Sequence, residues 1–279
     1  MPTAFVGETR LPKNFKRYAK QFSLLELDCE PGTVPGKAKL AACKQEAPEG
    51  LVFSLVVPSR VASLEPGPEL EKACKSAQNV ARQLGAKWWV VRTPAEVRPT
   101  RRSREGLAAL VQRLSVGGMR VAWEPRGVWD DAAAAETAAA VGAVLVQDIA
   151  REAPLPGRVL YARLLAVGKG GRVGLSLADL IAERVSAYDE AFVVVEGHGA
   201  RDIAQALGVA QQDDGLDALS LGAAGASGAV AAPRASEGHD EGDEDDDGDV
   251  EAEGDDLDDE DDDDLDDEDD DLDDEDEAP

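Results

Sequence analysis

The chain has 279 residues and a formal net charge of −28 at pH 7, and this charge is unevenly distributed. Residues 236–279 contain 31 of the 57 Asp and Glu residues and no Lys or Arg, so the rest keeps 26 acidic residues against all 29 Lys and Arg. A field of this sign repels polyanions, and we expect no direct nucleic-acid binding. No apolar run approaches the roughly 20 residues that cross a bilayer, and the N-terminus lacks an apolar signal-peptide core, so we expect a cytoplasmic protein without membrane association.

From residue 3 to 208, short runs rich in Val and Leu alternate with segments of helical periodicity, which favours successive β-α units. The predicted strands are residues 4–7, 24–29, 51–57, 87–92, 119–124, 143–148, 158–164 and 191–196. The predicted helices are residues 12–22, 35–46, 68–84, 101–115, 130–141, 176–188 and 200–207. Only a short AREAPLPG segment separates the sixth and seventh strands, so the sixth helix is eroded.

Eight β-α units in about 205 residues predict an α/β fold of the compact (β/α)8 TIM-barrel type, whose usual length is about 250 residues. An open doubly wound sheet is the rival fold. It often carries a glycine fingerprint after its first strand, but Gly7 is followed here by Glu8, Thr9 and Arg10. The barrel is therefore the favoured fold.

The composition divides the chain into three parts. Residues 1–208 form the predicted barrel, residues 209–235 a Gly- and Ala-rich flexible linker, and residues 236–279 an acidic tail that we expect to be disordered when free. Cys29, Cys43 and Cys74 are an odd number of cysteines without CxxC spacing. They are predicted to be buried thiols rather than disulfide or metal ligands.

Candidate catalytic residues follow from the rule that barrel sites lie at the C-terminal ends of the strands. In the second predicted strand, Leu25 and Leu27 alternate with Glu26 and Asp28, which directs the carboxylates toward the barrel interior and mouth. The candidates for acid-base catalysis are Glu26, Glu124 and Asp148, and Arg126 and Arg163 are candidates for orienting an anion. A divalent cation such as Mg²⁺ or Mn²⁺ is an alternative use of these oxygens, and a compensated polar network is another.

Two glycine-rich loops follow the last two strands, GKGGR at 168–172 and EGHGAR at 196–201. Loops in these positions often form a phosphate site, for which Lys169, Arg172 and Arg201 supply positive charge. His198 lies in the second loop and is a further ligand-binding candidate. It is the only histidine before the tail, which argues against a zinc hydrolase. Trp129, just past the fifth strand, is a candidate wall of the pocket.

Five motifs occur in an order that resembles the YecE-like uncharacterised TIM-barrel family, the domain of unknown function seventy-two. They are YAKQFSLLELD at 18–28, FSLVVP at 53–58, WEPRGVW at 123–129, VQD at 146–148 and LYARL at 160–164. The resemblance implies a (β/α)8-type barrel distantly similar to the xylose-isomerase-like sugar isomerases and deoxyribonucleases, with no established reaction. It also implies polar mouth residues at Glu26, Glu124, Arg126, Trp129, Asp148 and Arg163.

This chain departs from the family pattern at several positions. Asp28 stands where the family usually has Asn, and Val56 where it has Lys. Leu165 and Ala166 replace a His-Gly pair, and the Asn pair near the eighth strand is missing. Loss of the Lys and the His removes proton-transfer groups, which implies a changed substrate or lost catalysis.

Two functions remain open at this level, and the sequence does not decide whether the chain is an enzyme. The first is a barrel that binds a small anionic ligand of the sugar-phosphate type at its mouth, as a hydrolase or an isomerase. The second is a noncatalytic interaction protein whose acidic tail binds basic proteins or divalent cations.

Overall fold

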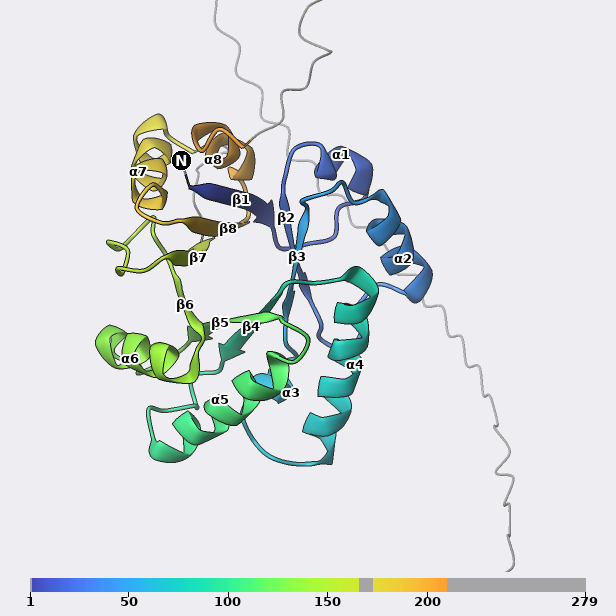
Figure 1. The fold of residues 1–279 in the computed structure, drawn as a ribbon, viewed down its shortest axis with the longest axis vertical. Coiled ribbons are helices and arrows are strands. Elements are labelled where there is room, and N and C mark those ends of the chain that lie inside the picture. Colours follow the sequence, from blue (N-terminus) through green and yellow to red (C-terminus); the bar gives the residue numbers. More distant parts are fainter. Residues whose placement is uncertain (1, 166–172, 210–279) are drawn as a thin grey trace, which may run out of the picture. The chain divides into compact units, whose positions relative to one another are not determined.

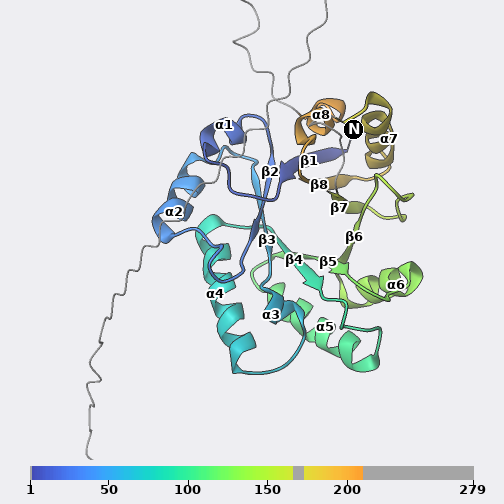
Figure 2. The same cartoon turned by 180° about the vertical axis from the view of Figure 1, so that it is seen from behind.

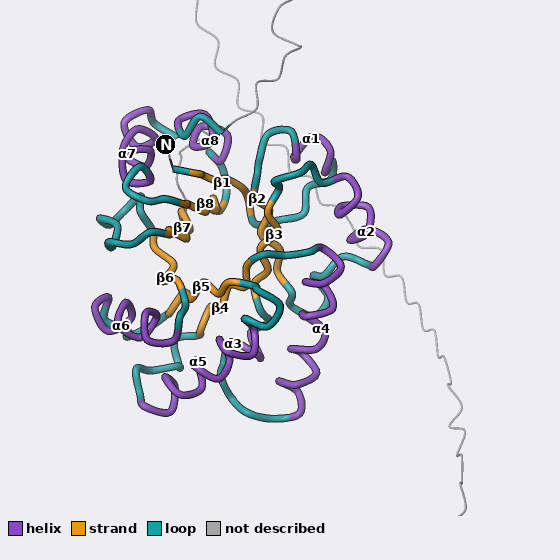
Figure 3. Tube along the Cα trace, viewed as in Figure 1, coloured by secondary structure: helices purple, strands orange, loops and turns teal. Residues whose placement is uncertain are grey.

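The computed structural model describes residues 2–165 and 173–209, which form a barrel of eight parallel strands in the order β1-β2-β3-β4-β5-β6-β7-β8. β8 pairs with β1 and closes the sheet, so the predicted (β/α)8 barrel is confirmed over the open sheet. The strands form a ring inside the helices (Figures 1 and 3). The strands are β1 Thr3–Glu8, β2 Leu24–Asp28, β3 Val52–Val56, β4 Trp88–Thr93, β5 Arg120–Pro125, β6 Val144–Gln147, β7 Val159–Leu165 and β8 Glu190–Glu196.

Helices cover the outside of the barrel in the same rotational order as the strands, which is also visible from behind (Figure 2). They are α1 Phe15–Ala19, α2 Lys37–Glu46, α3 Ser59–Ala62, α4 Pro68–Leu84, α5 Arg101–Leu114, α6 Asp131–Val141, α7 Leu175–Val185 and α8 Ala200–Ala206. As predicted, the segment between β6 and β7 contains no helix. The four-residue α3 was not predicted. The predicted linker beyond Val209, the predicted tail and the GKGGR loop lie outside the described residues.

Period-two alternation along the strands divides the core into two apolar layers. Leu25 and Leu27 of β2 belong to the large layer between the sheet and the helices, whereas Leu24 belongs to a smaller layer inside the barrel. The interior layer also contains Trp88, Tyr161 and Phe192, which come from β4, β7 and β8. Even-numbered residues of β2 therefore face the barrel interior, and this places Glu26 there.

The longest helix, α4, shows how the outer layer is built. Its buried residues recur at three- and four-residue steps and form one stripe against the sheet: Cys74, Ala77, Val80, Ala81 and Leu84. Pro68 begins the helix, where its missing N–H costs nothing. Gly85 ends it in the left-handed conformation at φ 65°, and its N–H donates to the Ala81 carbonyl.

A close approach of β1 to β2 depends on Gly7. A Cβ atom at this position would lie 1.8 Å from the carbonyl oxygen of Leu24, the residue with which Gly7 pairs. Any side chain here would therefore push β1 away from β2, where only two residue pairs join the strands.

Cys29, Cys43 and Cys74 are buried free thiols, as predicted. Among the helices of the described residues, none is both long and apolar enough to cross a membrane.

Candidate active site at the barrel mouth

The guanidinium group of Arg163 lies at the centre of a charged layer inside the barrel. Its Nη2 lies 2.5 Å from Glu26 Oε1, its Nε 2.9 Å from Glu124 Oε2, and its Nη1 2.6 Å from Glu196 Oε1. Arg92 is the second cation, with its Nε 3.0 Å from Glu124 Oε2 and its Nη2 3.7 Å from Glu196 Oε1. Arg163 and Glu26 are 2% and 1% exposed, so these two charges are almost completely removed from solvent.

Strand parity and register bring these five residues together. Arg92 and Glu124 are direct cross-strand partners of β4 and β5, so their side chains leave the sheet on the same face. Tyr161 of β7 and Val194 of β8 face the interior of the barrel. Arg163 and Glu196 follow them by two residues on the same strands, so their side chains face the interior too. Since all strands are parallel, their later residues meet at the C-terminal end of the barrel.

Tyr161 ties the charged layer to the apolar layer below it. Its hydroxyl donates to Glu26 Oε2 at 2.6 Å and lies 2.7 Å from the hydroxyl of Ser54. Because the tyrosine proton is used on Glu26, Ser54 must donate to Tyr161, and the hydrogen bonds run in one direction toward Glu26. Burial and then the charge of Glu26 raise the pKa of Tyr161 well above its usual value, so this residue is a fixed donor.

Charge compensation keeps Arg163 protonated. Burial lowers the pKa of its guanidinium, but the carboxylates, led by Glu26 and Glu124, raise it more, and the net pKa lies above the usual value. Both oxygens of Glu26 are occupied, one by Tyr161 and one by Arg163. Glu26 is therefore held in one orientation by two donors from the same strand.

The ion pairs of Glu124 are close but poorly aligned. Glu124 Oε2 lies 3.0 Å from Arg92 Nε and 2.9 Å from Arg163 Nε. All three atoms are buried, and none of them makes a hydrogen bond within the described residues. The contacts are Coulombic, and the N–H directions leave hydrogen-bonding capacity unused. Buried groups without a hydrogen bond are uncommon in folded proteins and are costly.

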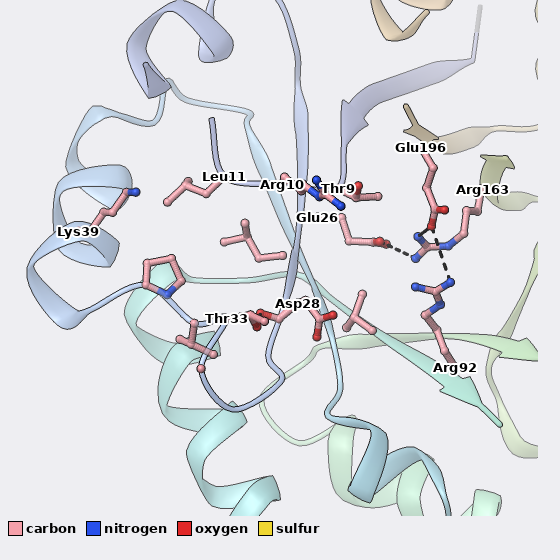
Figure 4. A pocket seen from close by; sticks show the side chains of 15 residues that line it. Thr9, Arg10, Leu11, Glu26, Asp28, Thr33, Lys39, Arg92, Arg163 and Glu196 are labelled. Atoms are coloured by element: carbon pink, nitrogen blue, oxygen red, sulfur yellow. Dashed lines mark hydrogen bonds and ion pairs between the residues drawn. The ribbon is translucent and has the colours of Figure 1, made fainter. Parts of the chain in front are cut away.

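A cavity of about 760 Å³ opens above this layer (Figure 4). One side of the cavity, its floor, is formed by the charged residues Glu26, Arg92, Arg163 and Glu196. The loops after β1 and β2 form the opposite side. The lining residues from the end of β2, from those loops and from α2 include Asp28, Thr9, Arg10, Leu11, Gly32, Thr33, Val34, Pro35 and Lys39. A cavity of this size admits a sugar phosphate or a ligand of similar bulk.

Glu26, Glu124 and Arg163 are brought together as the sequence predicts, but Asp148 is not. Its Oδ1 accepts the N–H of Ala150 and its Oδ2 lies 3.3 Å from Arg151 Nε. Asp148 lines a separate cavity of about 290 Å³ near α6. The Asp148 carboxylate takes part in a local turn instead of pointing into the mouth, because an Asp side chain readily accepts a hydrogen bond from the backbone N–H two residues later.

Arg126 and Trp129 lie away from the cavity floor. Arg126 is half exposed, and its Nη2 lies 3.7 Å from Glu124 Oε1. The Trp129 ring packs edge-on against Trp123 with centroids 4.8 Å apart, and its Nε1 donates to the Val97 carbonyl. Trp129 does not line the 760 Å³ cavity. It instead packs against the outer apolar layer.

Of the two predicted phosphate loops, only EGHGAR at 196–201 lies within the described residues. His198 is exposed, and Arg201 donates to the Gln21 side chain. Both lie near Glu8, a carboxyl group whose pKa is raised by burial and partly lowered again by His198 and Arg201. Neither residue lines the mouth cavity. Lys169 and Arg172 lie outside the described residues.

Several residues that shape the site were missed by the sequence analysis. Tyr161 and Ser54 occupy alternate strand positions that face the interior, so the alternation along the strands could have identified them. An interior tyrosine is, however, usually interpreted as part of the apolar core. Arg10 and Lys39 lie in a loop and a helix, where no alternation predicts the direction of the side chain. Within the described residues, no group of three His, Cys, Asp or Glu side chains could hold a metal ion. The floor carboxylates already contact arginines, so this donor set fits a divalent cation poorly.

Comparison with known proteins places the fold. No family model and no curated protein matches the chain. Among solved structures, a DUF72 family protein from Thermotoga maritima is 17% identical with a TM-score of 0.57, covering 74% of this chain and 99% of its own. A DUF72 family protein from Enterococcus faecalis is 16% identical with a TM-score of 0.58, covering 75% and 96%. A D-tagatose 3-epimerase-like protein is 13% identical with a TM-score of 0.50, covering 75% and 95%.

The two DUF72 neighbours are of the family that the sequence motifs resemble. They are matched over almost their whole length, and the match covers about three-quarters of this chain. Identities this low establish the fold and leave residue roles to the site itself. The chain has the TIM-barrel fold of the DUF72 proteins, the family that its motifs resemble.

Proposed function

We propose that this protein binds a small polyhydroxylated anion of the sugar-phosphate class in the mouth cavity. The observation that carries the proposal is the cavity of about 760 Å³, whose floor is formed by Glu26, Arg92, Arg163 and Glu196. The Nε atoms of Arg92 and Arg163 are buried and make no hydrogen bond within the described residues. Guanidinium groups and carboxylates together recognise vicinal hydroxyl groups, because each hydroxyl both donates and accepts.

Acid-base chemistry of the isomerase or hydrolase type is the reaction class that suits this floor. Glu26 and Glu124 contact the guanidinium of Arg163 from two sides. A hydroxyl group of a bound ligand can replace one of these arginine contacts, and the carboxylate concerned then keeps a hydrogen-bonding partner. Asp148 lies at another cavity, and we assign it no part in this chemistry. The D-tagatose 3-epimerase-like neighbour is a reason to include ketoses among the ligands tested.

Thermal unfolding of the full chain with free and phosphorylated ketoses and aldoses, with and without Mn²⁺, tests the binding. We expect at least one sugar phosphate to raise the midpoint by several degrees at millimolar concentration, because a ligand that binds only the folded state stabilises it. Glu124→Gln should abolish the shift, and Glu105→Gln, at an exposed position on α5, should preserve it. Absence of any shift across the panel would contradict the proposal.

A second function is proposed for the acidic tail, favoured by the 31 carboxylates in residues 236–279. A field of this strength attracts basic proteins or divalent cations in a salt-sensitive manner. The test compares pull-downs by the full chain and by a chain ending at residue 235, at low and high salt. Identical partners for both chains would remove the tail from the function.

A further inference from the structure

Glu196 differs from the other two carboxylates that contact Arg163. Both oxygens of Glu26 are held by donors, and Glu124 does not line the mouth cavity. Glu196 does line it, and its Oε1 accepts a hydrogen bond from Arg163 Nη1 at 2.6 Å. In the described part of the chain, its Oε2 accepts no hydrogen bond, and the side chain is 32% exposed. Glu196 therefore offers the cavity a carboxylate oxygen whose position is fixed through the other oxygen.

Arg92 offers the cavity a donor beside this acceptor. Its Nη2 lies 3.7 Å from Glu196 Oε1, which is an ion pair but too long for a hydrogen bond. Its guanidinium group makes no hydrogen bond with any of the described residues, although it lines the cavity from β4. Figure 4 shows Arg92 and Glu196 directed toward each other from β4 and β8, beside Arg163. A free N–H donor thus lies next to a free carboxylate oxygen.

A donor beside an acceptor is complementary to hydroxyl groups, because each hydroxyl donates one hydrogen bond and accepts others. Two neighbouring hydroxyls of a sugar fit this pair with one bond to each residue. Each bond involves a charged group and is roughly twice as strong as a bond between neutral groups. A phosphate dianion does not fit, because it lacks a proton to donate and is repelled by the charge of Glu196.

The other carboxylate that lines the cavity, Asp28, lacks this arrangement. Its Oδ1 accepts the Glu30 N–H, and among the described residues it forms no ion pair. Asp28 is exposed, whereas Glu196 is anchored to Arg163, which is 2% exposed. An acceptor held in place before the ligand arrives binds more tightly, since less freedom is lost on binding. Glu196 is therefore the better acceptor of the two.

We infer that Glu196 and Arg92 form the subsite that binds the hydroxyl groups of the ligand, with Glu196 Oε2 accepting a hydrogen bond and the Arg92 guanidinium donating one. The inference rests on the proposed function for the choice of a polyhydroxylated ligand. It does not depend on a phosphate group, so a neutral sugar tests it separately.

Calorimetric titration of the full chain with fructose and with fructose 6-phosphate tests this subsite. Glu196→Gln and Arg92→Gln should each weaken both affinities at least about tenfold, because each removes a hydrogen bond to a charged group. The matched controls Glu105→Gln and Arg82→Gln remove the same charges at exposed positions of α5 and α4 and should change neither affinity. Wild-type affinity of either mouth variant for fructose 6-phosphate would overturn the inference and leave the proposed function standing.

Neutral fructose separates this inference from the proposed function. Binding of fructose that depends on Glu196 and Arg92, without binding of any sugar phosphate, supports the subsite and rejects the proposed anion. Absence of binding by both sugars overturns both. If a variant does not fold, a ¹³C spectrum of the wild type decides: millimolar fructose should shift the side-chain carboxyl signal of Glu196 and leave that of Glu105 in place. An unmoved Glu196 signal with bound sugar overturns the inference.

Discussion

The two ends of the barrel interior are built from different side chains. Toward the N-terminal end, Phe5 stacks on Phe192 with centroids 4.8 Å apart, and Trp88 meets Phe192 edge-on at 4.9 Å. Toward the C-terminal end, Glu26, Arg163 and their partners replace the aromatic rings with charges. Burying aromatic surface stabilises the fold, whereas burying ion pairs brings little net stability. This difference is the one that the proposed ligand binding at the mouth would require.

Arg163→Met would break this comparison most severely. It leaves Glu26 without a cationic partner in the described residues, while Glu124 and Glu196 keep Arg92. Loss of one partner from a buried ion pair costs about 3–5 kcal/mol. We expect this loss in the free energy of unfolding from urea denaturation, together with loss of ligand binding. Arg158→Met removes an exposed ion pair with Asp189 and serves as the control. Equal stability of the two variants would contradict the described network.

Trp88→Ala tests the aromatic end. Trp88 is completely buried, and truncation of such a side chain costs about 3–5 kcal/mol through lost burial and the cavity left behind. We expect a similar loss of stability to that of Arg163→Met, but unchanged ligand affinity when binding is measured below the unfolding transition. A Trp88 variant that lost affinity as strongly as the Arg163 variant would show that the two ends act as one unit.

The sequence predicts the eight strands because each is a short apolar run bounded by turn residues, and alternation in β2 correctly directs Glu26 inward. It misses α3, since four residues are too few to show a helical period. At Asp148 the strand parity is correct, but a local bond to the Ala150 N–H competes with the mouth. Arg10 and Lys39 line the mouth cavity from a loop and a helix, where no alternation along the chain predicts the direction of a side chain.

Tyr161→Phe removes one hydroxyl at the boundary between the two ends. Glu26 Oε2 loses its donor and Ser54 loses its partner, and an unsatisfied buried group costs about 1–3 kcal/mol. We expect a loss of stability in that range and weaker ligand binding, because Glu26 is then held by Arg163 alone. Tyr188→Phe, which removes a hydroxyl that donates to the Leu155 carbonyl, should leave ligand affinity unchanged. Unchanged affinity of the Tyr161 variant would reject an orienting role for this hydroxyl.

Cys29 is a titratable group in the outer apolar layer, where its thiol reports on burial. Burial, followed by the charge of Asp28, raises the pKa of its thiol from 9.0 to about 12. The folded state therefore binds the thiol proton more tightly than the unfolded state does. The resulting stability is fully present below pH 9 and is lost as the pH rises toward 12.

The measurement compares the wild type with Cys29→Ala, so that titration of all other groups cancels. The difference in free energy of unfolding should stay constant up to pH 9 and then move against the wild type as the pH rises toward the folded pKa of about 12. At pH 8.5, iodoacetamide should modify Cys29 in urea far faster than in the native protein, because only the thiolate reacts. If the difference in free energy of unfolding did not depend on pH, or if the native and urea-unfolded proteins were alkylated at equal rates, then burial and Asp28 would not raise the pKa of this thiol.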